Sequence, residues 1–220
     1  MGKHLNTCRK SRGAAGSIVA GVAEVPAKAV VKVQTFYVKV QDRDDPRYWM
    51  HLDVPKSLRL RDLDTYLREI WLECCGHLSA FSISGVRYEV GDVPSFDPFG
   101  PRPRNMHVKL YKVLRPGRTF SYEYDFGSTT TLALRVVSGG ESELRFGIHL
   151  LARNDPPELV CHSCGSEPAS VICADCISYE GYELVRGYLC IDCGGRHGCD
   201  QWMLLPVVNS PRTGMCGYVG

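Results

Sequence analysis

Long apolar runs are missing from this chain of 220 residues. No segment approaches the ~18 uninterrupted apolar residues that a membrane-spanning helix needs. Lys3, Arg9, Lys10 and Arg12 make the N-terminus basic, but the Gly and Ala residues that follow them do not form the Leu-rich core of a secretory signal peptide. We therefore expect a cytoplasmic protein with no membrane association.

Common catalytic motifs are missing too. The sequence has no P-loop, no Gly-x-Ser-x-Gly nucleophile turn and no His-Glu-x-x-His helix. Positive charge is scarce at the C-terminal end, because residues 161–220 hold three Arg and no Lys against six Asp and Glu, a net charge of −3. A module that binds nucleic acid through its phosphates needs clustered Lys and Arg. This segment is therefore not expected to bind nucleic acid by itself.

Cysteine, by contrast, is abundant, with eleven residues in the chain. Three Cys-x-x-Cys pairs and a final His-x-Cys follow one another near the C-terminus. A two-residue gap lets a tight turn aim both thiolates at one metal ion, about 2.3 Å from each sulfur. The predicted metal ligands are Cys161, Cys164, Cys173, Cys176, Cys190, Cys193, His197 and Cys199.

A disulfide framework is the competing interpretation of this pattern. Eleven cysteines cannot all be paired within one chain, and a reducing cytosol favours metal ligation over disulfides at this spacing. Eight soft ligands are enough for two tetrahedral sites, so the sequence predicts two Zn²⁺ ions. A segment of about 60 residues with few aliphatic side chains needs such staples to fold. We therefore expect structural zinc and no catalytic residues around it.

Two ligand pairings remain open. In an interleaved arrangement, the first and third Cys-x-x-Cys pairs hold one ion, while the second pair and the His-x-Cys hold the other. In a sequential arrangement, neighbouring pairs share an ion. The spacer over residues 177–189 has room for a hairpin or short helix, which favours the interleaved form. Cys216 is an alternative ligand that could replace His197 or Cys199, whose one-residue gap is awkward geometrically.

The segment before the cysteines has the pattern of an α+β domain. The predicted strands cover residues 30–40, 48–54, 79–90, 106–114, 119–126 and 130–137. The run over 79–90 contains a possible hairpin turn at Ser84-Gly85, and the last strand is expected to end at a turn over 138–140. One helix is predicted over about 61–75, where apolar residues repeat at helical spacing. This order indicates a mainly antiparallel, β-grasp-like sheet with one packed helix.

Composition sets the expected boundaries of the domains. Residues 1–29 are small and basic without periodicity, which predicts a flexible arm. The α+β domain follows over 30–153, and a Pro-containing hinge over 154–157 leads into a zinc-binding module over 158–220.

Four side chains of the α+β domain bear on function. Cys74 and Cys75 lie on or beside the apolar stripe of the helix, so they are predicted to be core residues and not ligands. Glu123 and Asp125 alternate with aromatic residues, which places them on one face of a strand, about 7 Å apart. Two carboxylates at that separation can share a metal or divide acid and base roles. With no histidine nearby in the sequence, a polar sheet face is the simpler interpretation, in which Asp125 helps to fix the turn at Gly127.

Residues 30–140 resemble a known family, the Ri-plasmid (pRiA4b) ORF-3-like proteins, also described as insertion-element passenger proteins of TnpR type. The resemblance rests on a Trp-containing strand ending at Val54-Pro55, on the segment Phe81–Tyr88, and on Phe120-Ser-Tyr-Glu-Tyr-Asp-Phe-Gly127. It implies an α+β fold and little about function. In the family an acidic residue, a Trp and a His commonly follow the last motif, where this chain has Ser128-Thr-Thr-Thr-Leu132.

Three functions are compatible with these patterns. The first is a non-enzymatic zinc-binding adaptor that binds a protein partner through the C-terminal module. The second is nucleic-acid binding through the basic residues within 1–12 and 102–118, although the solvated face of a strand is the simpler interpretation of several residues in the second range. The third is a hydrolase-type enzyme that uses Glu123 and Asp125. The first is favoured, because no nucleophile–base arrangement is recognisable.

Overall fold

The computed structural model describes residues 32–90, 102–143, 147–180 and 183–220. The arm predicted over residues 1–29, including the nucleic-acid contact predicted for residues 1–12, lies outside this part of the chain.

Eight strands form one sheet, which is the main element of residues 32–153. They are β1 (Lys32–Asp42), β2 (Trp49–Pro55), β3 (Ser79–Ile83), β4 (Val86–Glu89), β5 (Arg104–Asn105), β6 (Thr119–Tyr124), β7 (Thr130–Glu143) and β8 (His149–Arg153). Their order is β5-β4-β3-β6-β7-β1-β2-β8. Neighbouring strands are antiparallel, apart from the short parallel contact between β4 and β5. This confirms the predicted α+β class and its mainly antiparallel sheet.

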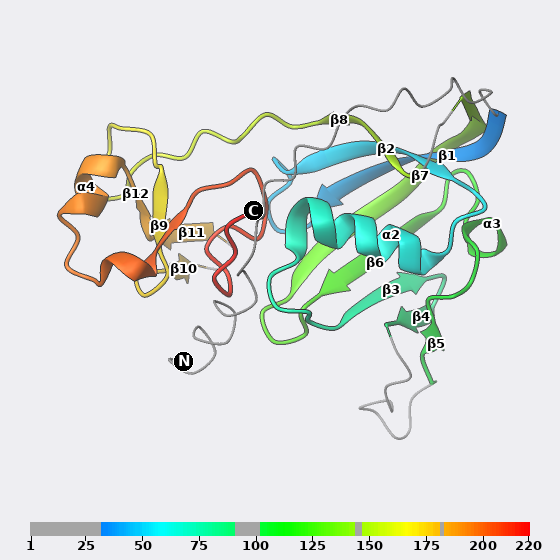
Figure 1. The fold of residues 1–220 in the computed structure, drawn as a ribbon, viewed down its shortest axis with the longest axis horizontal. Helices are drawn as coiled ribbons and strands as arrows, with labels where there is room; N and C mark the ends of the chain where they lie inside the picture. Colours follow the sequence, from blue (N-terminus) through cyan, green and yellow to red (C-terminus); the bar gives the residue numbers. More distant parts are fainter. Residues whose placement is uncertain (1–31, 91–101, 144–146, 181–182) are drawn as a thin grey trace, which may run out of the picture.

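One helix packs across a face of this sheet (Figure 1). Helix α2 (Leu60–Leu67) continues as a π-helix, η2 (Arg68–Leu72). Leu63, Leu67 and Trp71 are fully buried and belong to the same hydrophobic core as the inward-facing residues of the sheet. Burying a side chain of this size contributes about 1.5–3 kcal/mol. The contact between helix and sheet is therefore a substantial source of stability in this domain.

The predicted helix is too long, and the predicted turn over 138–140 is wrong. Helical structure ends at Leu72, so Cys74 and Cys75 lie beyond it. Strand β7 continues through the two glycines to Glu143, because it stays paired with β1 along its length and accommodates one irregularity in the register.

The strand predicted over 106–114 is wrong as well. Met106, Leu110 and Leu114 are buried at helical spacing, and the segment contains the short helix α3 (Leu110–Val113). Strand β8 is not among the predicted strands, because its exposed leucines break the alternation that marks a half-buried strand. The hairpin turn at Ser84-Gly85 is confirmed, with φ of 50° and 76° at its two residues.

The C-terminal module contains only short elements. Its strands and helical turns are β9 (Val171–Cys173), β10 (Ser178–Glu180), β11 (Glu183–Arg186), β12 (Tyr188–Leu189), α4 (Ile191–Gly195), η3 (Gln201–Met203) and β13 (Leu204–Pro206). Strands β12, β9 and β13 form a three-stranded sheet, and β10 pairs with β11. Across the described residues, no helix has the length and apolar character needed to cross a membrane.

The end of the chain returns to the sheet domain (Figure 1). Residues 207–220, called the tail below, follow β13 and form turns. Ser210 Oγ donates a hydrogen bond to the Trp71 carbonyl (2.7 Å). Asn209 pairs with Asn154, the buried first residue of the predicted hinge, through two hydrogen bonds of 2.8 and 2.9 Å. The tail, predicted as part of the zinc module, thus packs against the α+β domain.

A buried carboxylate links the helix to the sheet. Asp64 is fully buried and accepts hydrogen bonds from Tyr122 Oη (2.7 Å), Ser79 Oγ (2.5 Å) and Arg68 Nε (3.0 Å). The donors come from β6, β3 and η2, and Asp64 itself lies in α2. This one side chain therefore connects the helix to two strands of the sheet.

Replacing Asp64 with Ala is expected to destabilise the fold by about 2–4 kcal/mol, because it leaves the buried Tyr122 hydroxyl without its acceptor and removes one of the two carboxylates that pair with Arg68, the other being Glu73 (2.9 Å). Urea unfolding followed by circular dichroism measures this loss. The matched control is Glu69→Ala, one residue beyond Arg68 and exposed, which should change the free energy of unfolding by no more than about 0.5 kcal/mol. Equal effects of the two substitutions would contradict the role assigned to Asp64.

Strand β1 ends in a second buried acid, Asp42. Its Oδ1 accepts hydrogen bonds from the backbone N–H groups of Asp44 (3.0 Å) and Asp45 (2.6 Å). Burial nevertheless raises the pKa of Asp42 from 3.8 to about 7, and the charges of Asp44 and Asp45 act in the same direction. The folded state therefore binds this proton more tightly than the unfolded state does.

The contribution of Asp42 to stability is consequently expected to fall as the pH rises from about 4 to about 7, by at most about 1.4 kcal/mol per pH unit, and to level off above that range. Asp42→Asn should remove this slope, whereas Asp44→Asn, at an exposed position, should keep most of it. Urea unfolding of the three proteins between pH 5 and pH 8 provides the comparison. An unchanged slope in Asp42→Asn would refute the assignment.

Candidate metal centres

The structure brings twelve Cys and His side chains into three compact groups. Group 1 is Cys161, Cys164, Cys190 and Cys193; group 2 is Cys173, Cys176, His197 and Cys199; the tail group is Cys74, Cys75, His77 and Cys216. Within each group, the four ligand atoms all lie within 4.8 Å of one another. Four soft donors at such separations could hold a metal ion.

Groups 1 and 2 contain the eight ligands predicted from the sequence, in the interleaved pairing. The small sheet of the module brings them together. His162 N donates to the Tyr188 carbonyl (2.8 Å), which places the first Cys-x-x-Cys pair beside β12 and the third pair that follows it. Ala174 N donates to the Met203 carbonyl (2.9 Å), and Cys173 is the register partner of Leu204. These contacts bring the segment after the His-x-Cys to the second pair.

Backbone N–H groups surround the sulfurs of group 1. Hydrogen bonds from the backbone of Ser166 and Glu167 lower the pKa of the Cys164 thiol to about 6. The N–H of Cys193 donates to Cys190 Sγ (3.5 Å). Such donors favour the thiolate, which is the form that binds a metal ion. At Cys190, however, the effect of the Cys193 N–H is outweighed by burial and the neighbouring cysteine side chains, which raise the pKa to about 11.

The donors of group 2 are tightly crowded. Cys176 Sγ lies 3.6 Å from Cys199 Sγ and 3.3 Å from His197 Nε2. Hydrogen bonds with the sulfurs of Cys176 and Cys173 raise the pKa of Cys199 to about 12. Sulfurs at these distances resist joint ionisation, because their negative charges repel one another. A bound cation would offset that repulsion.

The hydrophobic core of the module is small, and candidate ligands make up a large part of it. One cluster of buried residues consists of Cys161, Cys173, Leu189, Cys190 and Met203, and three of these five are candidate metal ligands. Ile172 and Tyr188 are also buried in the module. Because so little apolar surface is buried, hydrophobic packing alone is a weak source of stability for this part of the chain.

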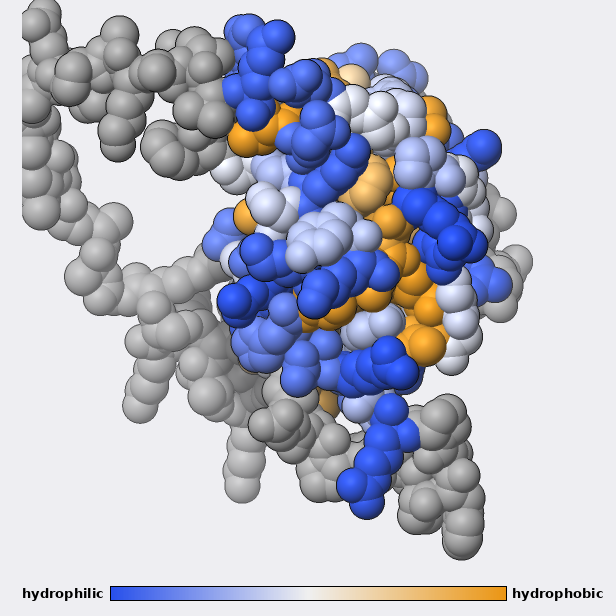
Figure 2. Space-filling view, turned by 90° about the vertical axis from the view of Figure 1, so that its right-hand side faces the viewer, coloured by the Kyte–Doolittle hydropathy of each residue, from blue (hydrophilic) through white to orange (hydrophobic). Residues whose placement is uncertain are grey.

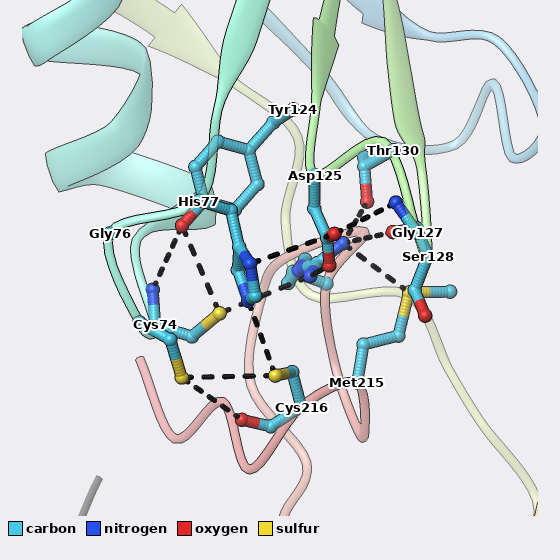
Figure 3. Close-up of polar contacts among 12 residues, drawn as sticks. Cys74, Gly76, His77, Tyr124, Asp125, Gly127, Ser128, Thr130, Met215 and Cys216 are labelled. Atoms are coloured by element: carbon cyan, nitrogen blue, oxygen red, sulfur yellow. Dashed lines mark hydrogen bonds and ion pairs between the residues drawn. The ribbon is translucent and has the colours of Figure 1, made fainter. Parts of the chain in front are cut away.

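The tail group is a candidate metal site that the sequence interpretation missed (Figure 3). Cys74 packs against the hydrophobic core, as predicted, but both Cys74 and Cys75 are only partly buried and lie in the loop after η2. Cys216 contacts this loop instead of joining His197 and Cys199. The adjacent cysteines and His77 are the local signal that could have revealed the group.

The structure separates Glu123 from Asp125. Strand β6 ends at Tyr124, and Asp125 has φ of 62°, so the side-chain alternation stops before it. Glu123 pairs with Arg87 (2.7 Å), whereas Asp125 is buried and forms an ion pair with Arg212 of the tail. The shared carboxylate face predicted for the two residues is therefore wrong.

Asp125 has the turn role expected of it and one unexpected neighbour. Its Oδ1 accepts a hydrogen bond from Gly127 N (3.1 Å), which fixes the turn after β6. The same oxygen lies 3.7 Å from His77 Nδ1. A histidine absent from the surrounding sequence is thus brought to Asp125 by the fold.

Comparison with known proteins identifies a domain family and one structural likeness. The family model of plasmid pRiA4b ORF-3-like proteins matches residues 32–163, more than half of the chain. The match covers the sheet domain and ends within the first Cys-x-x-Cys pair. No curated protein gives a significant match.

Three chains of solved structures match significantly. One is a protein of unknown function from Methanosarcina mazei Go1, with 18% sequence identity, 55% of this chain and 69% of that chain covered, and a TM-score of 0.46. A similarity of this size says nothing about function.

Proposed function

Given that the chain belongs to the plasmid pRiA4b ORF-3-like family, we propose that it is a non-enzymatic, zinc-stabilised adaptor. In this proposal the family domain is the scaffold. The C-terminal module holds two structural Zn²⁺ ions in groups 1 and 2 and binds a protein partner.

Zinc is the metal that best fits groups 1 and 2. Tetrahedral Zn²⁺ with Zn–S distances of about 2.3 Å places its ligand sulfurs about 3.8 Å apart. The separation of 3.6 Å between Cys176 Sγ and Cys199 Sγ is close to that value. Four cysteines in group 1, and three cysteines with one histidine in group 2, are common donor sets of structural zinc.

A structural role follows from the number of protein ligands. Catalytic zinc keeps one coordination position for water or substrate, whereas four protein ligands fill the tetrahedron. The observation that carries the proposal is that three of the five buried residues in the module's hydrophobic cluster are the candidate ligands themselves. Metal binding would then supply folding free energy that packing does not.

Metal content tests this assignment directly. Relative to the wild-type chain, Cys193→Ser and Cys173→Ser are each expected to lose about one zinc ion, and the double variant about two, because each removes a ligand from a different group. Elemental analysis of the purified chains gives the ratio.

Ser163→Ala is the matched control, because Ser163 lies inside a Cys-x-x-Cys pair and is exposed. It should leave the zinc content unchanged. Undiminished zinc in both cysteine variants, or fewer than the eleven cysteines of the sequence reacting as free thiols after denaturation with a chelator, would contradict the proposal.

The partner surface is best placed on α4 and η3 of the module. Ile191 and Trp202 are 72% and 54% exposed, and Gln201 Nε2 donates to the Gly194 carbonyl (3.3 Å), so the two elements are neighbours. Exposed large apolar side chains on a small module are typical of interaction sites. Asp192 and Asp200 are exposed beside them.

The charge of the surroundings indicates the partner's chemistry. Residues 161–220 have a net charge of −3 before any metal is bound, and seven thiolates with two Zn²⁺ would add a further −3. A partner segment with apolar side chains flanked by Lys or Arg would complement this surface.

Selection from a random peptide display library on the zinc-loaded chain should therefore enrich such basic, apolar peptides. Trp202→Ala is expected to weaken their binding at least tenfold without loss of zinc, because the indole provides contact area. Tyr111→Ala is the matched control, since Tyr111 in α3 is 53% exposed, and it should bind the peptides like wild type. Peptides without excess positive charge, or equal binding by the Trp202 and Tyr111 variants, would count against this surface.

The alternative function, nucleic-acid binding through residues 102–118, stays a prediction. Arg102, Arg104, Lys109, Lys112 and Arg115 are exposed. Figure 2 shows the end of the molecule that carries α3, where hydrophilic side chains cover much of the surface around a strip of apolar ones. Exposed cations are also what an ordinary solvated surface presents, so this surface does not favour nucleic acid specifically.

A further inference from the structure

The four donors of the tail group come from two distant parts of the sequence. Three of them, Cys74, Cys75 and His77, lie in the loop between η2 and β3, and Cys216 lies in the tail. Cys216 is 141 residues after Cys75 and 139 residues after His77 in the sequence. Cys216 has φ of 51°, so the tail turns sharply at the residue whose sulfur reaches the loop. Figure 3 shows Cys74, His77 and Cys216 close to one another, with Cys216 approaching from the tail.

The four ligand atoms of the group lie within 4.8 Å of one another, and two of their separations match those of ligands around one ion. Cys75 Sγ lies 3.7 Å from Cys216 Sγ, and His77 Nε2 lies 3.3 Å from the same sulfur. The corresponding distances in group 2 are 3.6 and 3.3 Å. Ligand sulfurs around tetrahedral zinc are about 3.8 Å apart, whereas a disulfide needs about 2.05 Å. The geometry therefore favours a shared metal ion over a Cys75–Cys216 bond.

A carboxylate lies behind the histidine of this group. His77 presents Nε2 to the sulfurs, while its Nδ1 lies 3.7 Å from Asp125 Oδ1. Metal-bound histidines commonly have such a carboxylate on the other ring nitrogen, which orients the ring and fixes its tautomer. Asp125 is itself held by Gly127 N and by Arg212. The carboxylate thus lies on the side from which a metal ligand is supported, although its 3.7 Å separation from Nδ1 is longer than a hydrogen bond.

The tail also supplies a buried cation next to the sulfurs. Arg212 is fully buried, and its guanidinium lies 3.9 Å from Cys74 Sγ and forms an ion pair with Asp125. Three thiolates and one neutral histidine around Zn²⁺ carry a net charge of −1. A nearby guanidinium offsets this charge in a partly buried site.

We propose that the tail group is a third zinc site, with Cys74, Cys75, His77 and Cys216 as its ligands. Because four protein ligands fill the coordination sphere, the ion is structural. It fastens the tail to the end of the helix of the family domain. This site lies outside groups 1 and 2, so it stands or falls independently of the zinc assigned to the module.

Zinc content of full-length variants tests the site. Wild type is expected to hold three ions per chain and Cys216→Ser two, with groups 1 and 2 still occupied. Met215→Leu, the matched control at the neighbouring position, is expected to retain three. The proposal is overturned if Cys216→Ser binds as much zinc as wild type, or if only nine of the eleven cysteines of the sequence react as free thiols after denaturation with a chelator.

Substitutions at His77 separate ligation from simple packing. His77→Ala is expected to lose one zinc ion, and His77→Cys to retain it, because a thiolate replaces the imidazole as fourth ligand. Hydrogen exchange of residues 207–218 should be faster in His77→Ala than in wild type and close to wild type in His77→Cys. Loss of the ion in both variants, or in neither, would overturn the ligand role of His77. This pair also decides the matter if Cys216→Ser fails to fold.

Discussion

The module at the C-terminal end is limited by how little apolar surface it can bury. Its buried apolar residues include Ile172, Tyr188, Leu189 and Met203, and three candidate metal ligands share the hydrophobic cluster of Leu189 and Met203. Thiols packed this closely are unfavourable neighbours once they ionise, as the raised pKa of Cys199 shows. On our proposal, each of these thiolates is instead attracted to a bound Zn²⁺ ion, which offsets the repulsion between them. The short strands, the helical turns and the exposed face with Trp202 then all depend on the metal.

The sheet domain has the opposite character, because it is held by an extensive apolar core. Helix α2 and η2 bury leucines and Trp71 on the sheet, and polar links such as Asp64 are few and enclosed. The tail connects these two kinds of structure. It brings Arg212 to Asp125 and Cys216 to the loop after η2, so the cysteine-rich end of the chain is attached to the sheet domain by buried and partly buried contacts.

The sequence predicts what depends on local pattern. The Cys-x-x-Cys spacing identifies the members of groups 1 and 2, because a tight turn determines which sulfurs lie together. Helix α2 and the turn at Ser84-Gly85 are equally local. Their periodicity and residue types are sufficient to identify them, and the structure confirms both.

What the sequence does not predict depends on contacts between distant residues. The continuation of β7 through two glycines depends on its pairing with β1. The interleaved pairing depends on how β12 and β13 flank β9. The tail group joins residues 141 positions apart, and the apolar stripe of the helix led to Cys74 and Cys75 being interpreted as core alone. Asp125 left the expected face because its backbone adopts a left-handed conformation.

The hydrogen-bonded pair of Asn154 and Asn209 holds together the two points at which the chain leaves the sheet domain and returns to it. The backbone leaves the sheet domain at Asn154 and returns to it at Asn209, so the two ends of the segment over 155–208 lie side by side. A segment whose two ends lie side by side has the topology of a domain inserted into a host domain. Its removal, with a short linker in its place, would leave the host sheet and the tail with their own contacts, and a different binding unit could be grafted at the same junction.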